Sequence, residues 1–130
     1  MPQREVPAPQ PSVYDSTMYI EQCTFGKITV SDKTYTSDLI VYPERVDPSW
    51  WRRQSHALCL EDLAAVLETK PSVVIIGTGH AGMLKVPPEL LSALRHMGID
   101  AYAEKTPDAV ELFKRVSSYS KTVACLHLTC

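Results

Sequence analysis

The stretch V-V-I-I-G-T-G-H-A-G, from Val73 to Gly82, says most about the fold of this chain. Its first four residues are all β-branched and apolar, and they predict a strand that is buried on both faces. The glycines that follow predict a tight turn, because residues without a Cβ let backbone amides turn sharply and approach an anion. A strand that leads into G-x-G-x-x-G is typical of dinucleotide-binding α/β proteins.

The residues after the glycines argue against a dinucleotide site. In such sites the helix begins within the glycine loop, whereas here Pro87 and Pro88 mark the first possible helix start, several residues beyond Gly82. Two interpretations stay open. The loop is either a tight chain reversal or a looser site for a small anion or metabolite. The candidate ligand-binding residues are Gly77, Thr78, Gly79, His80, Lys85 and Glu104.

Strand and helix patterns alternate along the rest of the chain. Residues 28–30 and 35–42 predict a hairpin, and strands are expected near 73–76, 99–103 and 122–128. Helices are expected from Leu60, from Pro87 and from Thr106, with the Thr106 side chain as the N-cap. We therefore predict an α/β fold in three layers, with a mixed, mostly parallel sheet, an N-terminal β-hairpin and about three helices.

Composition restricts the class of protein. Residues 1–17 contain four prolines and predict a flexible tail, so that residues 18–130 form a single domain. The net charge of −2 gives no basic field for nucleic acid, and no apolar run is long enough to span a membrane. The four cysteines contain no C-x-x-C pair, which favours a reduced, cytoplasmic protein.

Aromatic and basic residues gather in the region before the first helix. This cluster consists of Trp50, Trp51, Arg52, Arg53 and His56. Tryptophan and arginine dominate the energetics of protein interfaces. They also stack on each other through cation–π contacts that would simply make a loop rigid. An interaction surface and a self-stabilised loop are both consistent with this pattern.

Other titratable residues can be interpreted either as functional groups or as residues with no role beyond solvation and structure. His80 and Lys85 are an acid–base group and an anion ligand in one interpretation, and solvated loop residues in the other. Cys125, His127 and Cys130 share one strand and its end, and one strand cannot supply the three or four convergent ligands of a metal site. We therefore expect no metal site and no cofactor.

Six short motifs, in this order along the chain, resemble the Mth938-like domain family. They are Phe25–Ile28, Trp51-Arg52-x-x-x-His56, Ile76–Gly79, Lys85–Pro87, Glu104–Thr106 and His127–Cys130. The family includes bacterial and archaeal proteins of unknown function, an adipogenesis-associated animal protein and a mitochondrial assembly factor of respiratory complex I. The resemblance implies a three-layer α/β fold around a mixed sheet. It implies no enzymatic activity, so no catalytic residue is carried over.

Two hypotheses for function follow. The first is a non-enzymatic interaction or assembly module that binds a protein partner through the aromatic and basic cluster. The second is a protein, or an enzyme, that binds a small anionic ligand through residues 77–85. We favour the first, because the sequence contains no complete catalytic constellation. A homo-oligomer is compatible with either.

Overall fold

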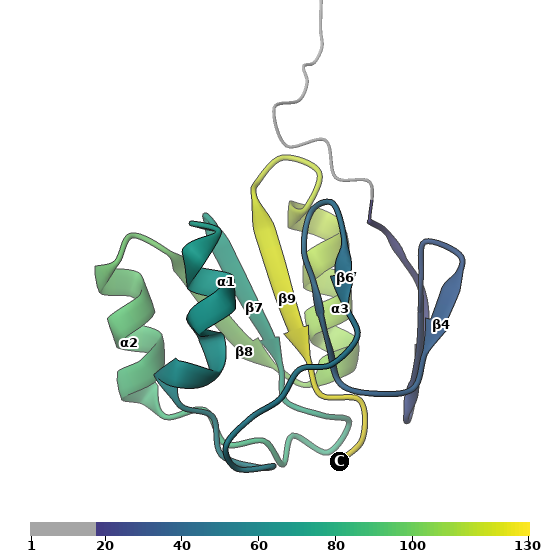
Figure 1. The fold of residues 1–130 in the computed structure, drawn as a ribbon, viewed down its shortest axis with the longest axis horizontal. Helices are drawn as coiled ribbons and strands as arrows, with labels where there is room; N and C mark the ends of the chain where they lie inside the picture. The colour runs from purple at the N-terminus through teal and green to yellow at the C-terminus, as the bar shows by residue number, and fades with distance from the viewer. Residues whose placement is uncertain (1–17) are drawn as a thin grey trace, which may run out of the picture.

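The computed structural model describes residues 18–130, which form three layers around a central sheet (Figure 1). The predicted tail at residues 1–17 lies outside the described residues. The central sheet has five strands in the spatial order β6-β5-β9-β7-β8. Their bounds are β5 (Leu39–Val41), β6 (Val46–Asp47), β7 (Val73–Gly77), β8 (Asp100–Glu104) and β9 (Thr122–Leu126).

The central sheet is mixed. Strand β7 pairs in parallel with β8 on one side and with β9 on the other. Strand β5 pairs antiparallel with both β9 and β6. All five residues of β7 and of β9 are buried, as expected for strands that are covered on both faces. Strand β9, the last of the described strands, occupies the middle of the sheet.

A second, antiparallel sheet precedes the central one and consists of β2 (Ile20–Thr24), β3 (Lys27–Val30) and β4 (Lys33–Tyr35). The prediction of one strand over residues 35–42 is wrong in detail. Tyr35 pairs with Ile28 in the small sheet, whereas Leu39 pairs with Leu126 in the central sheet. Residues 36–38 carry the chain from one sheet to the other, so no single strand can span them.

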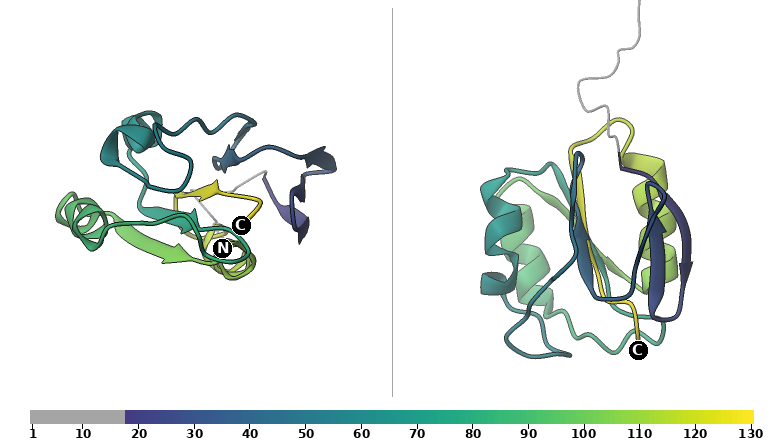
Figure 2. Two further views of the ribbon diagram at one scale, coloured as in Figure 1. Left: turned by 90° about the horizontal axis from the view of Figure 1, so that it is seen from below. Right: turned by 45° about the vertical axis from the view of Figure 1, so that its right-hand side comes forward.

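Helices complete the layers, as Figures 1 and 2 show. A 3₁₀ turn, η1 (Leu60–Leu63), leads into α1 (Ala64–Glu68). Helix α2 (Pro88–His96) lies beside α1 on one face of the central sheet, and α3 (Thr106–Val116) covers the opposite face together with the small sheet. The predicted three-layer α/β class with an N-terminal hairpin and three helices is confirmed.

The alternation of side chains along β7 explains why both faces need a cover. Val74 and Ile76 pack in one core with Leu63 and Leu94, which come from η1 and α2. The intervening residues Val73 and Ile75 pack in a second core that includes Phe113 of α3 and Ile28 and Val30 of β3; all of these side chains are buried. Each helix layer thus buries one side of the same apolar strand.

The prediction that Thr106 caps α3 is wrong. The cap position is Lys105, and Thr106 is the first helical residue. The Thr106 hydroxyl accepts a hydrogen bond from the Gly79 amide at 2.8 Å and donates one to the His127 carbonyl at 2.6 Å. The side chain therefore joins three segments instead of capping the helix, because those two partners occupy its hydroxyl.

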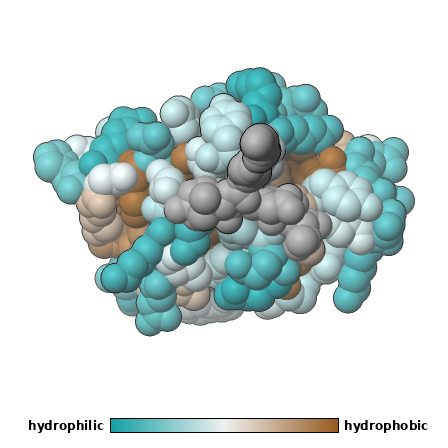
Figure 3. Space-filling model, turned by 90° about the horizontal axis from the view of Figure 1, so that it is seen from above, coloured by the Kyte–Doolittle hydropathy of each residue, from teal (hydrophilic) through white to brown (hydrophobic). Residues whose placement is uncertain are grey.

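The molecular surface differs between its sides. Viewed from the end opposite the carboxyl terminus, most of the described surface is hydrophilic, and hydrophobic residues reach it mainly on the side that carries α1 and α2 (Figure 3). Within residues 18–130 there is no helix with the length and apolar character needed to cross a membrane.

Candidate functional site

Asp38 is the centre of a polar cluster at the carboxyl end of β9. Its Oδ2 atom accepts hydrogen bonds from His127 Nδ1 at 2.7 Å and from Arg52 Nη2 at 2.9 Å. Its Oδ1 atom accepts one from the Leu128 amide at 2.8 Å. Burial alone would raise the pKa of Asp38, but these hydrogen bonds outweigh it and lower that pKa. Asp38 is therefore a carboxylate at neutral pH.

His127 is held in one orientation by this carboxylate. The side chain is buried, and a carboxylate acceptor at 2.7 Å requires a proton on Nδ1. Arg52 Nη2 lies 3.4 Å from the same nitrogen, but a protonated Nδ1 cannot accept its hydrogen. In the neutral ring, Nε2 therefore keeps its lone pair and is available as a base or as a metal ligand.

Two exposed side chains lie next to His127. The ring of His56 meets the His127 ring edge-on, with centroids 5.5 Å apart and planes at 79°. The Cys130 sulfur lies 3.8 Å from His56 Nε2. One ligand atom from each of His56, His127 and Cys130 lies within 4.8 Å of the others. We call these three residues the His–Cys cluster.

The glycine loop holds this cluster in place. The amide of His80 donates to the Thr129 carbonyl at 2.7 Å, and the amide of Met83 donates to the Cys130 carbonyl at 2.9 Å. The amide of Lys85 donates to the His56 carbonyl at 2.8 Å. Residues 80–85 thus fix the backbones of both chain segments that contribute to the cluster.

The same loop offers few amides to an anion. Besides the three donors above, the amides of Thr78, Gly79 and Gly82 donate to Glu104, Thr106 and Gly79 respectively. Gly79 has a φ of +101°, and a Cβ there would lie 2.4 Å from the Cys130 carbonyl carbon. Glycine is required at this position by close packing against the carboxyl-terminal segment.

The aromatic and basic residues predicted as a cluster have separate roles. Trp50 is buried and its indole donates to the Asp62 carbonyl at 3.2 Å. The Arg52 guanidinium lies 4.6 Å from the Trp50 ring centroid, and its side chain is also buried. Trp51, in contrast, is 74% exposed. The structure thus contains a stacked, buried pair and a neighbouring tryptophan that faces solvent.

The remaining predicted residues lie elsewhere. The Lys85 and Glu104 side chains are exposed. Glu104 borders a hollow of about 380 Å³ and not the His–Cys cluster; the other residues around it are Tyr102, Asp108, Glu111, Leu112 and Arg115. The Phe25 ring lies 5.6 Å from the partly buried His80 ring.

Sequence reasoning missed the role of Asp38. Nothing in the local pattern T-S-D before a strand distinguishes it from a turn aspartate. It also separated His127 and Cys130 from His56, because these residues lie on different segments. Position in the predicted fold could have pointed to these residues. His127 and Cys130 lie at the carboxyl end of a predicted strand, where α/β proteins bind ligands, and His56 lies in the loop with the two tryptophans.

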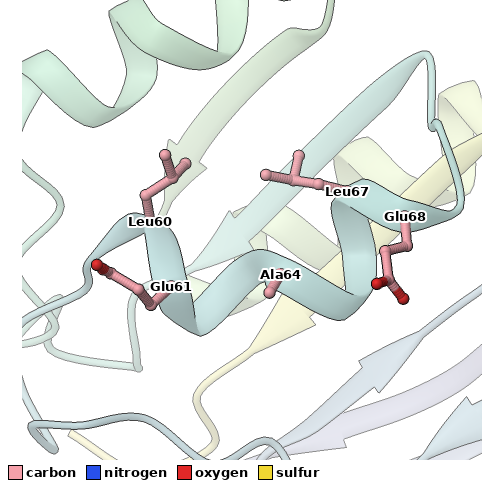
Figure 4. Close-up of a pocket in the computed structure, with 5 residues that line it drawn as sticks. All are labelled: Leu60, Glu61, Ala64, Leu67 and Glu68. Atoms are coloured by element: carbon pink, nitrogen blue, oxygen red, sulfur yellow. The ribbon is translucent and has the colours of Figure 1, made fainter.

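A hydrophobic groove runs along η1 and α1, apart from the His–Cys cluster. It has a volume of about 510 Å³ and is lined by Leu60, Glu61, Ala64, Leu67 and Glu68. Leu60 and Leu67 project from the same side of the segment, and the two glutamates lie toward its two ends (Figure 4). Glu61 also lines a second hollow, together with Arg53 and Gln54 of the loop that carries Trp51, so the two hollows share this residue.

Comparison with known proteins fits this architecture. Residues 20–128 match the sequence model of the family described as "Protein of unknown function (DUF498/DUF598)". The chain belongs to the DUF498/DUF598 family. This match, together with solved structures of Mth938-like proteins, confirms the resemblance drawn from the motifs.

Solved structures of several bacterial and archaeal proteins share the fold. A conserved hypothetical protein from Pyrococcus horikoshii OT3 is 27% identical, with a TM-score of 0.73, and the match covers 87% of this chain and 100% of that one. The protein MT938 is also 27% identical, with a TM-score of 0.68, and the match covers 88% and 100%.

A Mth938-like domain from Bordetella pertussis is 17% identical, with a TM-score of 0.60, over 98% of this chain and 92% of that one. At that identity the likeness concerns the fold alone. The DUF498/DUF598 fold of this chain is thus shared across distant sequences.

Proposed function

We propose that this DUF498/DUF598 protein is an interaction module that binds an amphipathic, basic segment of a partner protein. The binding surface consists of the exposed Trp51 and the groove along η1 and α1. The observation that carries the proposal is this groove, whose apolar floor of Leu60, Ala64 and Leu67 has glutamates toward both ends. An apolar helix face with flanking lysines or arginines complements it in shape and charge.

The loop next to the groove is rigid, which favours binding. Asp62 accepts hydrogen bonds from the amides of Arg53 at 3.0 Å and Cys59 at 2.9 Å, and its carbonyl accepts from the Trp50 indole. Trp51 is therefore presented on a preorganised segment and loses little conformational entropy on binding. The backbone amide of Glu61, and then the Cys59 thiol, lower the pKa of the Glu61 carboxyl, which keeps it negatively charged at neutral pH.

Affinity capture with wild type and four variants of the full chain tests this proposal. Ala64→Glu places a bulky charge in the groove, whereas Ala65→Glu changes an exposed neighbour that does not line it. Trp51→Ala removes the exposed indole, and Tyr119→Ala removes an exposed aromatic ring elsewhere.

We expect wild type and the two control variants, Ala65→Glu and Tyr119→Ala, to capture the partner. The purified partner should bind Ala64→Glu and Trp51→Ala at least about tenfold more weakly than it binds wild type. Its contact segment, mapped by cross-linking, contains a basic amphipathic helix. Equal capture by all four variants, or a contact segment of acidic or extended character, contradicts the proposal.

A further inference from the structure

We infer that the His–Cys cluster is a binding site for a divalent transition-metal ion of the zinc type. The site is independent of the proposed partner surface, since none of its residues lines the groove. The expectation of no metal site arose because His127 and Cys130 come from one chain segment. The structure adds His56 from a separate loop, which makes three convergent ligands.

The spacing of the ligand atoms fits a tetrahedral ion. Zinc–nitrogen bonds of about 2.0 Å and zinc–sulfur bonds of about 2.3 Å place tetrahedral nitrogen and sulfur ligands roughly 3.6 Å apart. Cys130 Sγ and His56 Nε2 are already 3.8 Å apart. The three ligand atoms together lie within 4.8 Å. Small rotations of the exposed His56 and Cys130 side chains therefore close the site around an ion.

The third ligand is already oriented. Metal-bound histidines almost always donate their other ring N–H to a carboxylate or carbonyl, which fixes the ring and increases its basicity. Asp38 fills that role for His127 at 2.7 Å, and Asp38 is itself held by Arg52 and by the Leu128 amide. The structure thus contains a carboxylate–histidine pair whose Nε2 lies 3.5 Å from the Thr129 hydroxyl, a weak contact that an ion at the cluster would replace.

The ligand chemistry identifies the class of ion. Two imidazoles and a thiolate suit Zn²⁺ or Co²⁺, whereas Ca²⁺ and Mg²⁺ prefer oxygen ligands. Three protein ligands leave the fourth tetrahedral position for water or for another molecule, as in open zinc sites. His56 and Cys130 are both exposed, so an ion has a path from solvent. The backbones of all three ligands are fixed by hydrogen bonds to residues 77–85.

Titration with Co²⁺ tests the inference. The full chain, freed of metal with a chelator and carrying no affinity tag, is expected to develop a thiolate-to-cobalt charge-transfer band and the d–d bands of a four-coordinate ion. Added Zn²⁺ is expected to remove both bands, since zinc binds the same ligands more tightly than cobalt.

Variants assign the ligands. Cys130→Ser is expected to abolish the charge-transfer band, and His56→Ala to weaken Co²⁺ binding by more than about 100-fold. Cys59→Ser and His96→Ala are the matched controls, because they remove a second thiol and a second exposed imidazole outside the cluster. Both are expected to bind Co²⁺ as wild type does. Circular dichroism of each variant establishes that it is folded.

Asp38→Asn distinguishes a positioning residue from a ligand. We expect it to weaken Co²⁺ binding by about 10- to 100-fold while the form of the d–d bands stays the same. The inference is overturned if wild type shows no charge-transfer band. It is equally overturned if folded Cys130→Ser and His56→Ala bind Co²⁺ with wild-type affinity and spectrum.

Discussion

The Asp38 carboxylate and the His127 imidazole share a hydrogen bond of 2.7 Å although 89 positions separate them in the chain. The contact exists because β5 begins just after Asp38, β9 ends just before His127, and these two strands are antiparallel neighbours. The pair therefore lies at one end of the sheet and connects the entry to one strand with the exit from the other.

The first prediction concerns this pair. Asp38→Asn removes the negative charge that Arg52 and His127 share, and we expect it to lower the free energy of unfolding by about 2 kcal/mol. The His127 ring should also lose its preference for a proton on Nδ1. Urea unfolding and ¹⁵N chemical shifts of the imidazole measure the two effects. Asp100→Asn, an exposed control, should change stability by less than about 0.5 kcal/mol.

The second prediction concerns Gly79. Gly79→Ala adds a Cβ 2.4 Å from the Cys130 carbonyl carbon, whereas Gly98→Ala adds one with no atom within 4 Å. Both residues have positive φ, so both variants lose about 1 kcal/mol from backbone strain. We expect Gly79→Ala to be less stable than Gly98→Ala by a further 1–3 kcal/mol or so, because the backbone must shift. If the two variants unfold at the same temperature, the loop accommodates the added Cβ at Gly79 without a further loss of stability.

The third prediction concerns the Thr106 hydroxyl. Thr106→Val keeps the shape of the buried side chain but leaves the Gly79 amide and the His127 carbonyl without their partner. An unsatisfied buried group costs about 1–3 kcal/mol, so we expect a loss of roughly 2 kcal/mol or more in chemical unfolding. Thr106→Ser retains the hydroxyl and should recover much of this loss. A Thr106→Val variant as stable as wild type would mean that water replaces both contacts.

The fourth prediction is a dependence on alkaline pH. Burial raises the pKa of Tyr42, an effect that the positive charge of Arg45 over its ring partly offsets. The phenol ionises near pH 10 in the unfolded chain and at a higher pH in the folded one. Its contribution to the free energy of unfolding is therefore complete below about pH 10 and is lost as the pH rises above that value.

Urea unfolding at pH 8 and at pH 11 checks this dependence. Wild type should lose more stability between the two pH values than Tyr42→Phe does. Tyr119→Phe changes an exposed ring, and its loss should match that of wild type. If Tyr42→Phe loses as much stability between pH 8 and pH 11 as wild type does, groups other than Tyr42 cause the sensitivity to alkaline pH.

Local patterns in the sequence predicted the elements well where one physical cause dominates. The β-branched run at Val73–Ile76 predicts a strand that is covered on both faces, and the structure has that strand. Pro87 and Pro88 mark the earliest start of the second helix, and α2 begins at Pro88. Thr106 shows the opposite case. Its local pattern is that of an N-cap, but its hydroxyl forms hydrogen bonds with Gly79 and His127, which come from other segments of the chain.

The candidate site was harder to predict because it depends on strand order. The sequence placed His56 on a different segment from His127 and Cys130, and no local pattern states that β5 pairs with β9. Asp38 joins Arg52 and His127 only through that pairing. The role of Gly79 is hidden in the same way, since its requirement for glycine comes from the carboxyl-terminal segment and not from a ligand.

The central position of β9 has a consequence for synthesis on the ribosome. Strands β5 and β7 both pair with β9 and not with each other, so neither side of the sheet can close until residues 122–126 have left the exit tunnel. Until then, β5 and β7 each have an edge that no other described strand pairs with. Strand β9 is thus the element that joins two separate half-sheets into one sheet.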